Sequence, residues 1–181
     1  MLFRSPRGLP LLDKTGAQMY VLDWNQFGPD GTATRVCTTF HSYEDGWYLI
    51  LPEDWQGEIA AARRDSNTAA VTERAVVFYH WTEEMARARA EAEEAAQAAL
   101  AEDPDAIVDL GPTPEEFLTI YRLTGTNRTL RAKRDERFIL FESSDMIYAA
   151  RFHDGDWSHG LDSDTLRERF NRIRVAWSAE N

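Results

Sequence analysis

Runs of β-branched and aromatic residues, several with apolar and polar positions alternating, predict strands through most of this chain. Turn-forming segments such as FGPDG and SYEDG separate the early runs. Two of the runs, GWYLIL and ERAVVFYHW, are apolar on both faces, as expected of strands that are covered on both sides. The predicted strands cover residues 17–24, 32–40, 46–51, 73–81 and 117–125, and two more lie within 137–152.

One long helix is predicted between the strands. Thr82 supplies an N-cap oxygen, and Glu83 and Glu84 place negative charge at the positive end of the helix dipole. The Ala/Glu/Arg-rich stretch that follows has high helix propensity but only two large apolar side chains, Met85 and Leu100. We therefore expect residues 82–112 to be an insertion that consists of an exposed helix and a proline-containing linker.

The end of the chain has the spacing of an amphipathic helix. Leu166, Phe170, Ile173 and Trp177 recur at intervals of three and four residues, which places them along one helix face. This stripe predicts a C-terminal helix packed on the sheet. For residues 126–136, which are mostly polar, a short helix and a hairpin arm both remain open.

Together these patterns predict an α+β fold. We expect a single, mainly antiparallel sheet flanked by helices, with the acidic Ala-rich helix inserted and the C-terminal amphipathic helix packed on the sheet. Residues 1–16 are predicted to be an irregular N-terminal segment and residues 17–181 one domain. The hydrophobic content of 43% is sufficient for a core that needs neither disulfides nor metals.

Composition excludes several classes of function. Cys37 is the only cysteine, so no internal disulfide and no cysteine-rich zinc site is expected. No apolar run approaches the length of a membrane span, which predicts a soluble chain.

The net charge is −11, and eight acids and two arginines between Thr82 and Asp105 contribute −6 of it. Without a basic surface, nucleic acid is not an expected partner. We expect a monomer.

The segment FHDGDWSHGLDSD, residues 152–164, is rich in groups that can bind metals or act in catalysis. Counted from Asp154, a calcium loop would need glycine where His159 stands and an acid where Thr165 stands. A serine-nucleophile elbow around Ser158 would need glycine where Asp156 stands. The segment is therefore interpreted as a turn, with Asp162, Ser163 or Asp164 capping the next helix.

A small anion is a possible ligand at one strand end. The sequence LTGTNR leaves an apolar strand through a glycine, and a helix starting there would place Thr126 or Asn127 at its N-cap, with Arg128 and Arg131 alongside. Backbone amides and guanidinium groups of this kind bind anions. The alternative is a hairpin whose arginines pair with Asp135, Glu136 and solvent.

The stretches GWYLILPEDWQGEI and ERAVVFYHW, followed by FLTIYRLTG, RFILFE, IYAARF and LRERFNRIRVAW, resemble PsbP-like α/β domains in outline. Their order is also similar to that of uncharacterised envelope lipoproteins of Gram-positive gut bacteria. The resemblance implies an antiparallel sheet between helices that binds or scaffolds, and an extracytoplasmic location if an upstream signal has been removed. The chain has no lipobox cysteine, so a cytoplasmic location remains the alternative.

The sequence therefore predicts a non-catalytic binding or assembly module, and the resemblance implies an association with the cell envelope. Its partner would be an unknown protein or a small anionic ligand, and neither a cofactor nor a metal is expected. No acid, base and nucleophile occur at a workable spacing, which argues against an enzyme. The alternative function is a hydrolase that uses Ser158 and His159.

Overall fold

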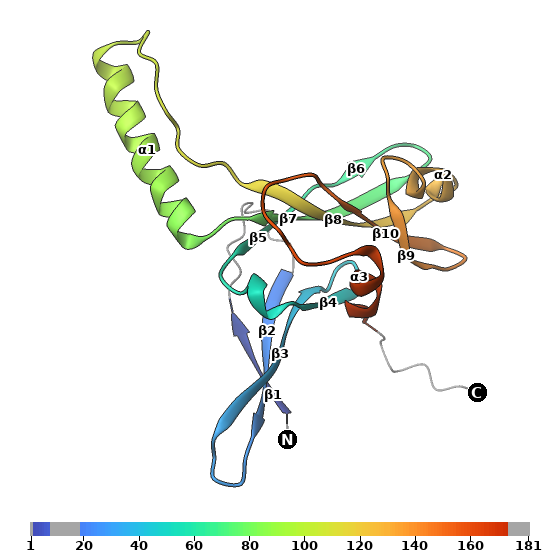
Figure 1. The fold of residues 1–181 in the computed structure, drawn as a ribbon. Helices are drawn as coiled ribbons and strands as arrows, with labels where there is room; N and C mark the ends of the chain where they lie inside the picture. Colours follow the sequence, from blue (N-terminus) through green and yellow to red (C-terminus); the bar gives the residue numbers. More distant parts are fainter. Residues whose placement is uncertain (1, 8–18, 174–181) are drawn as a thin grey trace, which may run out of the picture.

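A computed structural model describes residues 2–7 and 19–173, which form two antiparallel β-sheets and a few helices (Figure 1). The strands are β1 (Leu2–Arg7), β2 (Met19–Phe27), β3 (Ala33–Ser42), β4 (Trp47–Leu51), β5 (Ile59–Arg63), β6 (Ser66–Asn67), β7 (Thr72–His80), β8 (Glu115–Thr124), β9 (Phe138–Glu142), β10 (Met146–Phe152) and β11 (Phe170–Arg172). The helices are the 3-10 helix η1 (Glu53–Trp55) and the α-helices α1 (Glu83–Glu102), α2 (Arg128–Ala132) and α3 (Ser163–Arg169).

The first sheet has the strand order β1-β2-β3-β4-β11. Strands β2 and β3 form a long hairpin, and only the part of β3 from Thr38 to Ser42 pairs with β4. The rest of the hairpin, together with β1, extends away from the body of the molecule (Figure 1). Residues 2–7, which were expected to be irregular, instead pair antiparallel with β2 as strand β1.

The second sheet has the order β5-β7-β8-β10-β9, with β6 pairing to β7 at one end. The central strands β7 and β8 are paired along most of their length, from Thr72 opposite Thr124 to His80 opposite Glu115. A bulge between Phe78 and Tyr79 shifts the register near the end that leads to α1. The predicted strands at 73–81, 117–125 and within 137–152 are confirmed as β7, β8, β9 and β10.

The main core lies between the two sheets. Phe40 of β3 and Phe78 of β7 meet edge to face with their ring centroids 4.9 Å apart, and Trp47 of β4 is also buried there. Aromatic pairs of this geometry add stability beyond the area that they bury. The fully buried side chains of this core belong to both sheets, to η1 and to α3, and include Phe40, Trp47, Leu49, Trp55, Phe78, Phe117, Leu118, Ile120 and Leu166.

The second sheet is also covered on its other face. Val77 and Tyr79 of β7 pack there with Trp81, and the first turn of α1 contacts them through Met85. Further along this face, Tyr121 and Leu123 of β8 and Ile147 of β10 pack against Ala132 of α2. The helix α2 therefore lies on the face of the second sheet that points away from the first.

The prediction of a single sheet flanked by helices is wrong. The molecule is rich in β-structure, with two antiparallel sheets packed on each other and only short or peripheral helices. The physical reason lies in strands such as β7, where Val76 and Phe78 face the first sheet and Val77 and Tyr79 face the opposite side. The first sheet supplies the cover that was assigned to helices.

The predicted C-terminal amphipathic helix is also wrong in its extent. Asp162 caps α3 as expected, accepting hydrogen bonds from the backbone N–H groups of Asp164 and Thr165. The helix ends at Arg169, because the next three residues pair antiparallel with β4 as strand β11. Leu166 is buried from the helix, whereas Phe170 is buried from the strand. The predicted contact of Trp177 lies outside the described residues.

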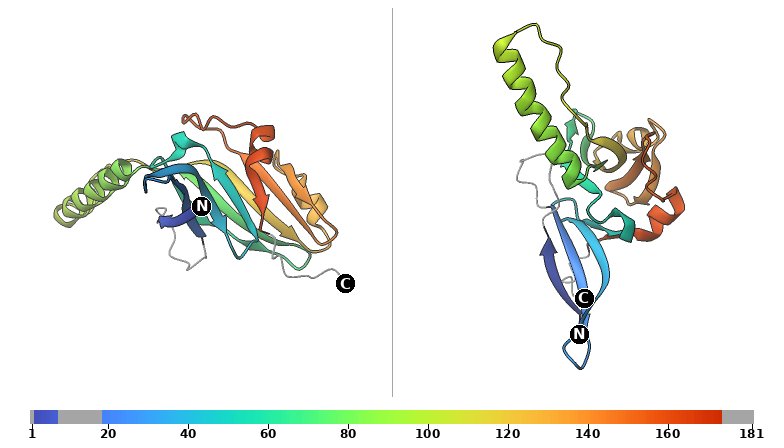
Figure 2. Two further views of the ribbon diagram at one scale, coloured as in Figure 1. Left: turned by 90° about the horizontal axis from the view of Figure 1, so that it is seen from below. Right: turned by 60° about the vertical axis from the view of Figure 1, so that its left-hand side comes forward.

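Helix α1 forms as expected and projects from the second sheet (Figures 1 and 2). Thr82 caps it by accepting a hydrogen bond from the N–H of Met85. The following chain returns along the helix, with Gly111 lying against Ala88 and Ala92. We call residues 83–114 the arm.

None of the helices within residues 2–7 and 19–173 combines the length and apolar character that a membrane span requires.

Candidate functional site

A pocket of about 320 Å³ lies where the turn between β6 and β7 meets α2. The turn is closed by a hydrogen bond from the N–H of Thr68 to the carbonyl of Val71, 2.8 Å long. Its tip is fastened to the loop before α2, because the N–H of Asn127 and the hydroxyl of Thr126 both donate to the carbonyl of Ala70. Two segments far apart in the sequence thus form opposite walls of one pocket.

Gly125 allows these two walls to approach each other. Its φ of +100° is unfavourable for residues with a Cβ atom, and a Cβ placed there would lie 2.5 Å from the carbonyl oxygen of Ala70. We expect Gly125→Ala to lower the free energy of unfolding by roughly 1–3 kcal/mol from the backbone conformation alone, and by more because the turn must move. Chemical denaturation measures the change.

The control for this substitution is Gly57→Ala. Gly57 also has a positive φ, +82°, but a Cβ there would meet no atom within 4 Å. The Gly57→Ala variant therefore has the strain of a positive φ, but its Cβ collides with no other atom. Equal losses for the two variants would contradict the close approach at Gly125.

The carboxylate of Glu73 is the centre of the site. Glu73 is the second residue of strand β7, is buried with 6% of its surface exposed, and binds two guanidinium groups. Arg131 donates to it through Nε and Nη2, and Arg137 through Nη1 and Nη2 at 3.0 and 3.3 Å. Both arginines are therefore bidentate, the geometry that gives the strongest carboxylate contacts.

These contacts keep Glu73 ionised. Burial alone raises the pKa of the carboxyl group, but the hydrogen bonds from Arg131 and Arg137 outweigh this effect and leave the pKa below its ordinary value of 4.5. The same hydrogen bonds raise the pKa of Arg131. Arg137 is itself buried and stacks on the ring of Tyr121, with Cζ 3.7 Å from the ring centroid. All three charges are thus fixed in place.

The chain between α2 and Arg137 is conformationally unusual. Asp135 and Glu136 both have a positive φ, 55° and 58°, which is uncommon for residues other than glycine. Arg137 follows directly and donates to Glu73. The two left-handed residues thus turn the chain so that this arginine reaches the site, at a cost in backbone strain.

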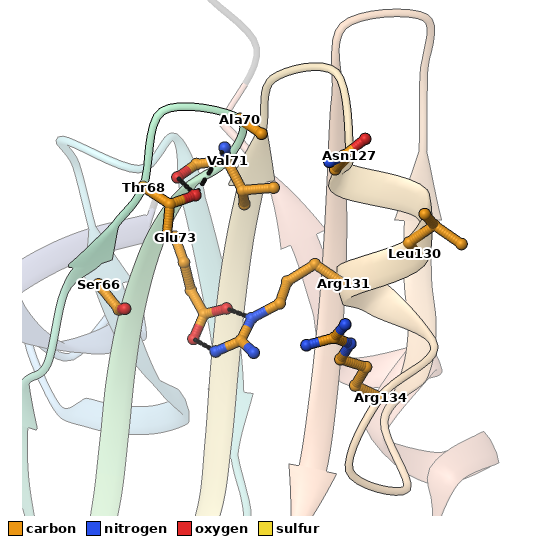
Figure 3. Close-up of a pocket in the computed structure, with 9 residues that line it drawn as sticks. All are labelled: Ser66, Thr68, Ala70, Val71, Glu73, Asn127, Leu130, Arg131 and Arg134. Atoms are coloured by element: carbon orange, nitrogen blue, oxygen red, sulfur yellow. Dashed lines mark hydrogen bonds and ion pairs between the residues drawn. The ribbon is translucent and has the colours of Figure 1, made fainter.

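A third arginine faces the pocket without a partner. Figure 3 shows the Arg131 side chain reaching across the pocket to Glu73, with Arg134 below it on the same wall. Arg134 is exposed, and among the described residues its guanidinium makes no hydrogen bond or ion pair. Asp135 lies 3.8 Å from Arg137, so the site holds three guanidinium groups and two carboxylates, which leaves a surplus of one positive charge. The lining consists of Ser66, Thr68, Ala70, Val71, Glu73, Asn127, Leu130, Arg131 and Arg134.

The predicted anion-binding residues are partly brought together. Residues 128–132 are helical, as α2, with Asn127 at the N-cap position. Asn127 and Arg131 line the pocket, whereas Thr126 is engaged with the turn. Arg128 points elsewhere, since its guanidinium donates to the carbonyls of Gly125 and Ser144. The helix has five residues, so the positive charge here comes from side chains and not from a helix dipole.

The sequence interpretation missed Glu73, Arg134 and Arg137. Its alternative paired the arginines with Asp135 and Glu136. Asp135 does lie 3.8 Å from Arg137, but the acceptor for Arg131 lies 58 residues earlier in the chain. One signal was available, because Glu73 stands near the start of a strand that continues as the apolar run from Ala75 to Tyr79. A carboxylate in that setting usually has a charged partner.

The structure gives Ser158 and His159 no catalytic arrangement. Nδ1 of His159 accepts the N–H of Leu161 at 3.2 Å, and its ring stacks on Phe152 with centroids 4.7 Å apart. Burial lowers the pKa of His159. Ser158 is exposed and, within the described part of the chain, makes no hydrogen bond to this histidine. A serine nucleophile needs a base within hydrogen-bond reach, so the geometry does not support the hydrolase.

The segment after β10 is held by packing. Trp157 stacks on His80 with centroids 4.8 Å apart and nearly parallel rings, and its backbone N–H donates to Glu115. The interpretation of residues 152–164 as a turn and helix cap fits these contacts. Within the described residues, no three His, Cys, Asp or Glu side chains are placed to hold a metal ion.

No model of a known protein family matches the chain, and no curated protein or solved structure is significantly similar to it. The resemblance to PsbP-like domains, and the extracytoplasmic location that it implies, therefore stay predictions. Function has to be argued from the geometry of the site.

Proposed function

We propose that this protein is a non-catalytic binding module that holds a small anion in the pocket between the β6–β7 turn and α2. The surplus of positive charge carries the proposal. Arg131 and Arg137 already saturate Glu73, so the charge of Arg134 is not balanced within the site. An anion entering the pocket supplies the missing negative charge.

The hydrogen-bond donors of the pocket are already oriented before such a ligand binds. A guanidinium group has five N–H donors, and Arg131 uses Nε and one hydrogen of Nη2 on Glu73. Its remaining donors are held in a fixed orientation by that bidentate contact, which reduces the entropy lost on binding. Asn127 and Ser66 add polar groups, while Val71 and Leu130 give the pocket an apolar side. A carboxylate or phosphate attached to a small apolar body matches this lining.

Catalysis is not supported at this site. Glu73 is the only carboxylate in the lining, and its lowered pKa and four hydrogen bonds leave it unsuited to accept a proton near neutral pH. Arginine is protonated at any physiological pH and does not act as a base. The site can bind and orient an anion but offers no group to transform it.

The test is an anion screen by thermal denaturation with phosphate, sulfate, acetate and butyrate, followed by titration calorimetry for any anion that stabilises the protein. We expect a saturable rise in Tm with at least one of them, and a loss of affinity of tenfold or more in Arg134→Ala. Lys133→Ala is the matched control, because it removes the same charge from the end of α2 at a residue that does not line the pocket.

Equal losses in the two variants would show that bulk charge and not the pocket is responsible. Absence of any saturable stabilisation in the wild-type protein would also contradict the proposal.

A further inference from the structure

The outer half of the arm is acidic and carries exposed apolar side chains. Residues 91–110 contain seven acids and no lysine or arginine. Ile107 is completely exposed, and Leu100 and Leu110 are exposed by 39% and 44%. An isolated exposed apolar residue is ordinary, but a group of three at the end of a projecting element is typical of a contact surface.

The return segment of the arm places acid groups on both sides of Ile107. Asp105, Ile107 and Asp109 are exposed, whereas the intervening Ala106 and Val108 are partly buried. An extended chain alternates in this way, with every second side chain on the same side. The arm thus presents an isoleucine with a carboxylate two residues away in each direction.

The proposed anion pocket has the complementary features. Its lining offers Arg131 and the unpaired Arg134, together with the apolar side chains of Val71 and Leu130. Leu130 is 67% exposed. Basic groups beside an apolar surface match an isoleucine flanked by acids, both in charge and in the position of the apolar contact.

We propose that the pocket receives the arm of a second copy of this chain. The proposal rests on the proposed function and names its ligand: Asp105 or Asp109 of one molecule supplies the anion for Arg131 and Arg134 of the next. Ile107 then packs on the apolar side of the pocket. The arm and the pocket lie at opposite ends of the molecule (Figures 1 and 2), so the contact is head to tail and lengthens into a chain of molecules.

This assembly departs from the monomer expected from the sequence. Because the contact depends on charge, association should strengthen as the ionic strength falls. Sedimentation velocity on the full-length protein over a range of concentrations, at low and at high salt, measures it. We expect the mean molecular mass to rise with concentration at low salt and the association constant to fall at least tenfold at high salt.

Two variants block the two ends separately. The arm variant, Asp105→Asn/Ile107→Ser/Asp109→Asn, keeps an acceptor for the N–H of Gly111, which Asp109 binds at 2.8 Å. The pocket variant is Arg134→Glu. Each should stay monomeric alone, at concentrations where the wild-type protein associates. Mixed together, they should form a dimer and nothing larger, because one intact arm then meets one intact pocket.

Each outcome decides the question. A wild-type protein that remains monomeric at low salt, an arm variant that associates as well as wild type, or a mixture that forms no dimer would overturn the head-to-tail contact. The arm variant retains the pocket, so its stabilisation by small anions tests the proposed function independently. If that stabilisation is present and association is absent, only the contact between copies fails.

Discussion

Glu73→Ala should be among the most damaging single substitutions in this protein, with an expected loss of roughly 3–5 kcal/mol in the free energy of unfolding. Two guanidinium groups converge on this carboxylate, and that of Arg137 is buried, with 4% of its side chain exposed. Removal of the carboxylate leaves the buried Arg137 charge with Asp135, 3.8 Å away and 51% exposed, in place of its bidentate partner. This costs more than the lost hydrogen bonds alone. Equilibrium denaturation by urea measures the change.

Glu116→Ala is the matched control. Glu116 also accepts two hydrogen bonds from one arginine, but the side chain of that partner, Arg64, is 57% exposed. Water and salt screen this pair, so we expect a loss of about 1 kcal/mol or less. Similar losses at the two positions would show that burial of the Arg137 charge is not the source of the effect.

The Glu73 site also predicts how stability depends on pH. The pKa of Glu73 in the folded protein lies below its ordinary value of 4.5. The stabilisation is therefore fully present above that ordinary value and is lost as the pH falls through the lower pKa of the folded state. The stability difference between wild type and Glu73→Gln should accordingly shrink between pH 6 and strongly acidic conditions. A difference independent of pH would contradict the ion pairing.

Features that depend on neighbouring residues could be predicted from the sequence. The caps formed by Thr82 and Asp162 involve backbone groups only two or three residues away, and both are present as expected. Most strands were recognisable for the same reason, because composition and alternation are local properties. The exposed helix α1 followed from its alanine content, which leaves little to bury.

The second sheet and the last strand could not be predicted in this way. Strand β7 is apolar on both faces, and this pattern does not reveal whether a helix or another sheet covers each one. At the C-terminal end, the spacing of Leu166 and Phe170 fits one face of a single helix. It fits a helix followed by a strand equally well. The edge of β4 decides between them, since pairing with residues 170–172 satisfies backbone groups of β4 that a helix would leave unpaired.

The candidate site was only half predictable for a related reason. Asn127 and Arg131 belong to a recognisable glycine-containing segment, and both line the pocket. Their position depends on Glu73 and on the turn at Ala70, which are more than fifty residues away in the chain. Strand pairing between β7 and β8 brings these segments together, and that pairing is not visible in the spacing of the residues themselves.

Trp55→Ala is the second substitution with a large expected effect, a loss of roughly 3–5 kcal/mol. Trp55 is 1% exposed and meets Phe117 edge to face with centroids 4.9 Å apart. Its Nε1 donates to the carbonyl of His159 at 2.8 Å, which fastens the segment between β10 and α3 to the rest of the core. Truncation therefore opens a cavity and also releases that segment.

Trp55→Phe separates these two contributions. Phenylalanine keeps most of the aromatic packing but has no N–H, so the carbonyl of His159 loses its donor, at an expected cost of about 1–2 kcal/mol. Hydrogen exchange at residues 153–162 should accelerate in both variants, because both release the segment. Val36→Ala, at a residue 53% exposed, should change stability by less than about 0.5 kcal/mol. If Trp55→Ala were as mild as this control, Trp55 could not occupy the buried position on η1, against Phe117 of β8, that joins the core to the His159 segment.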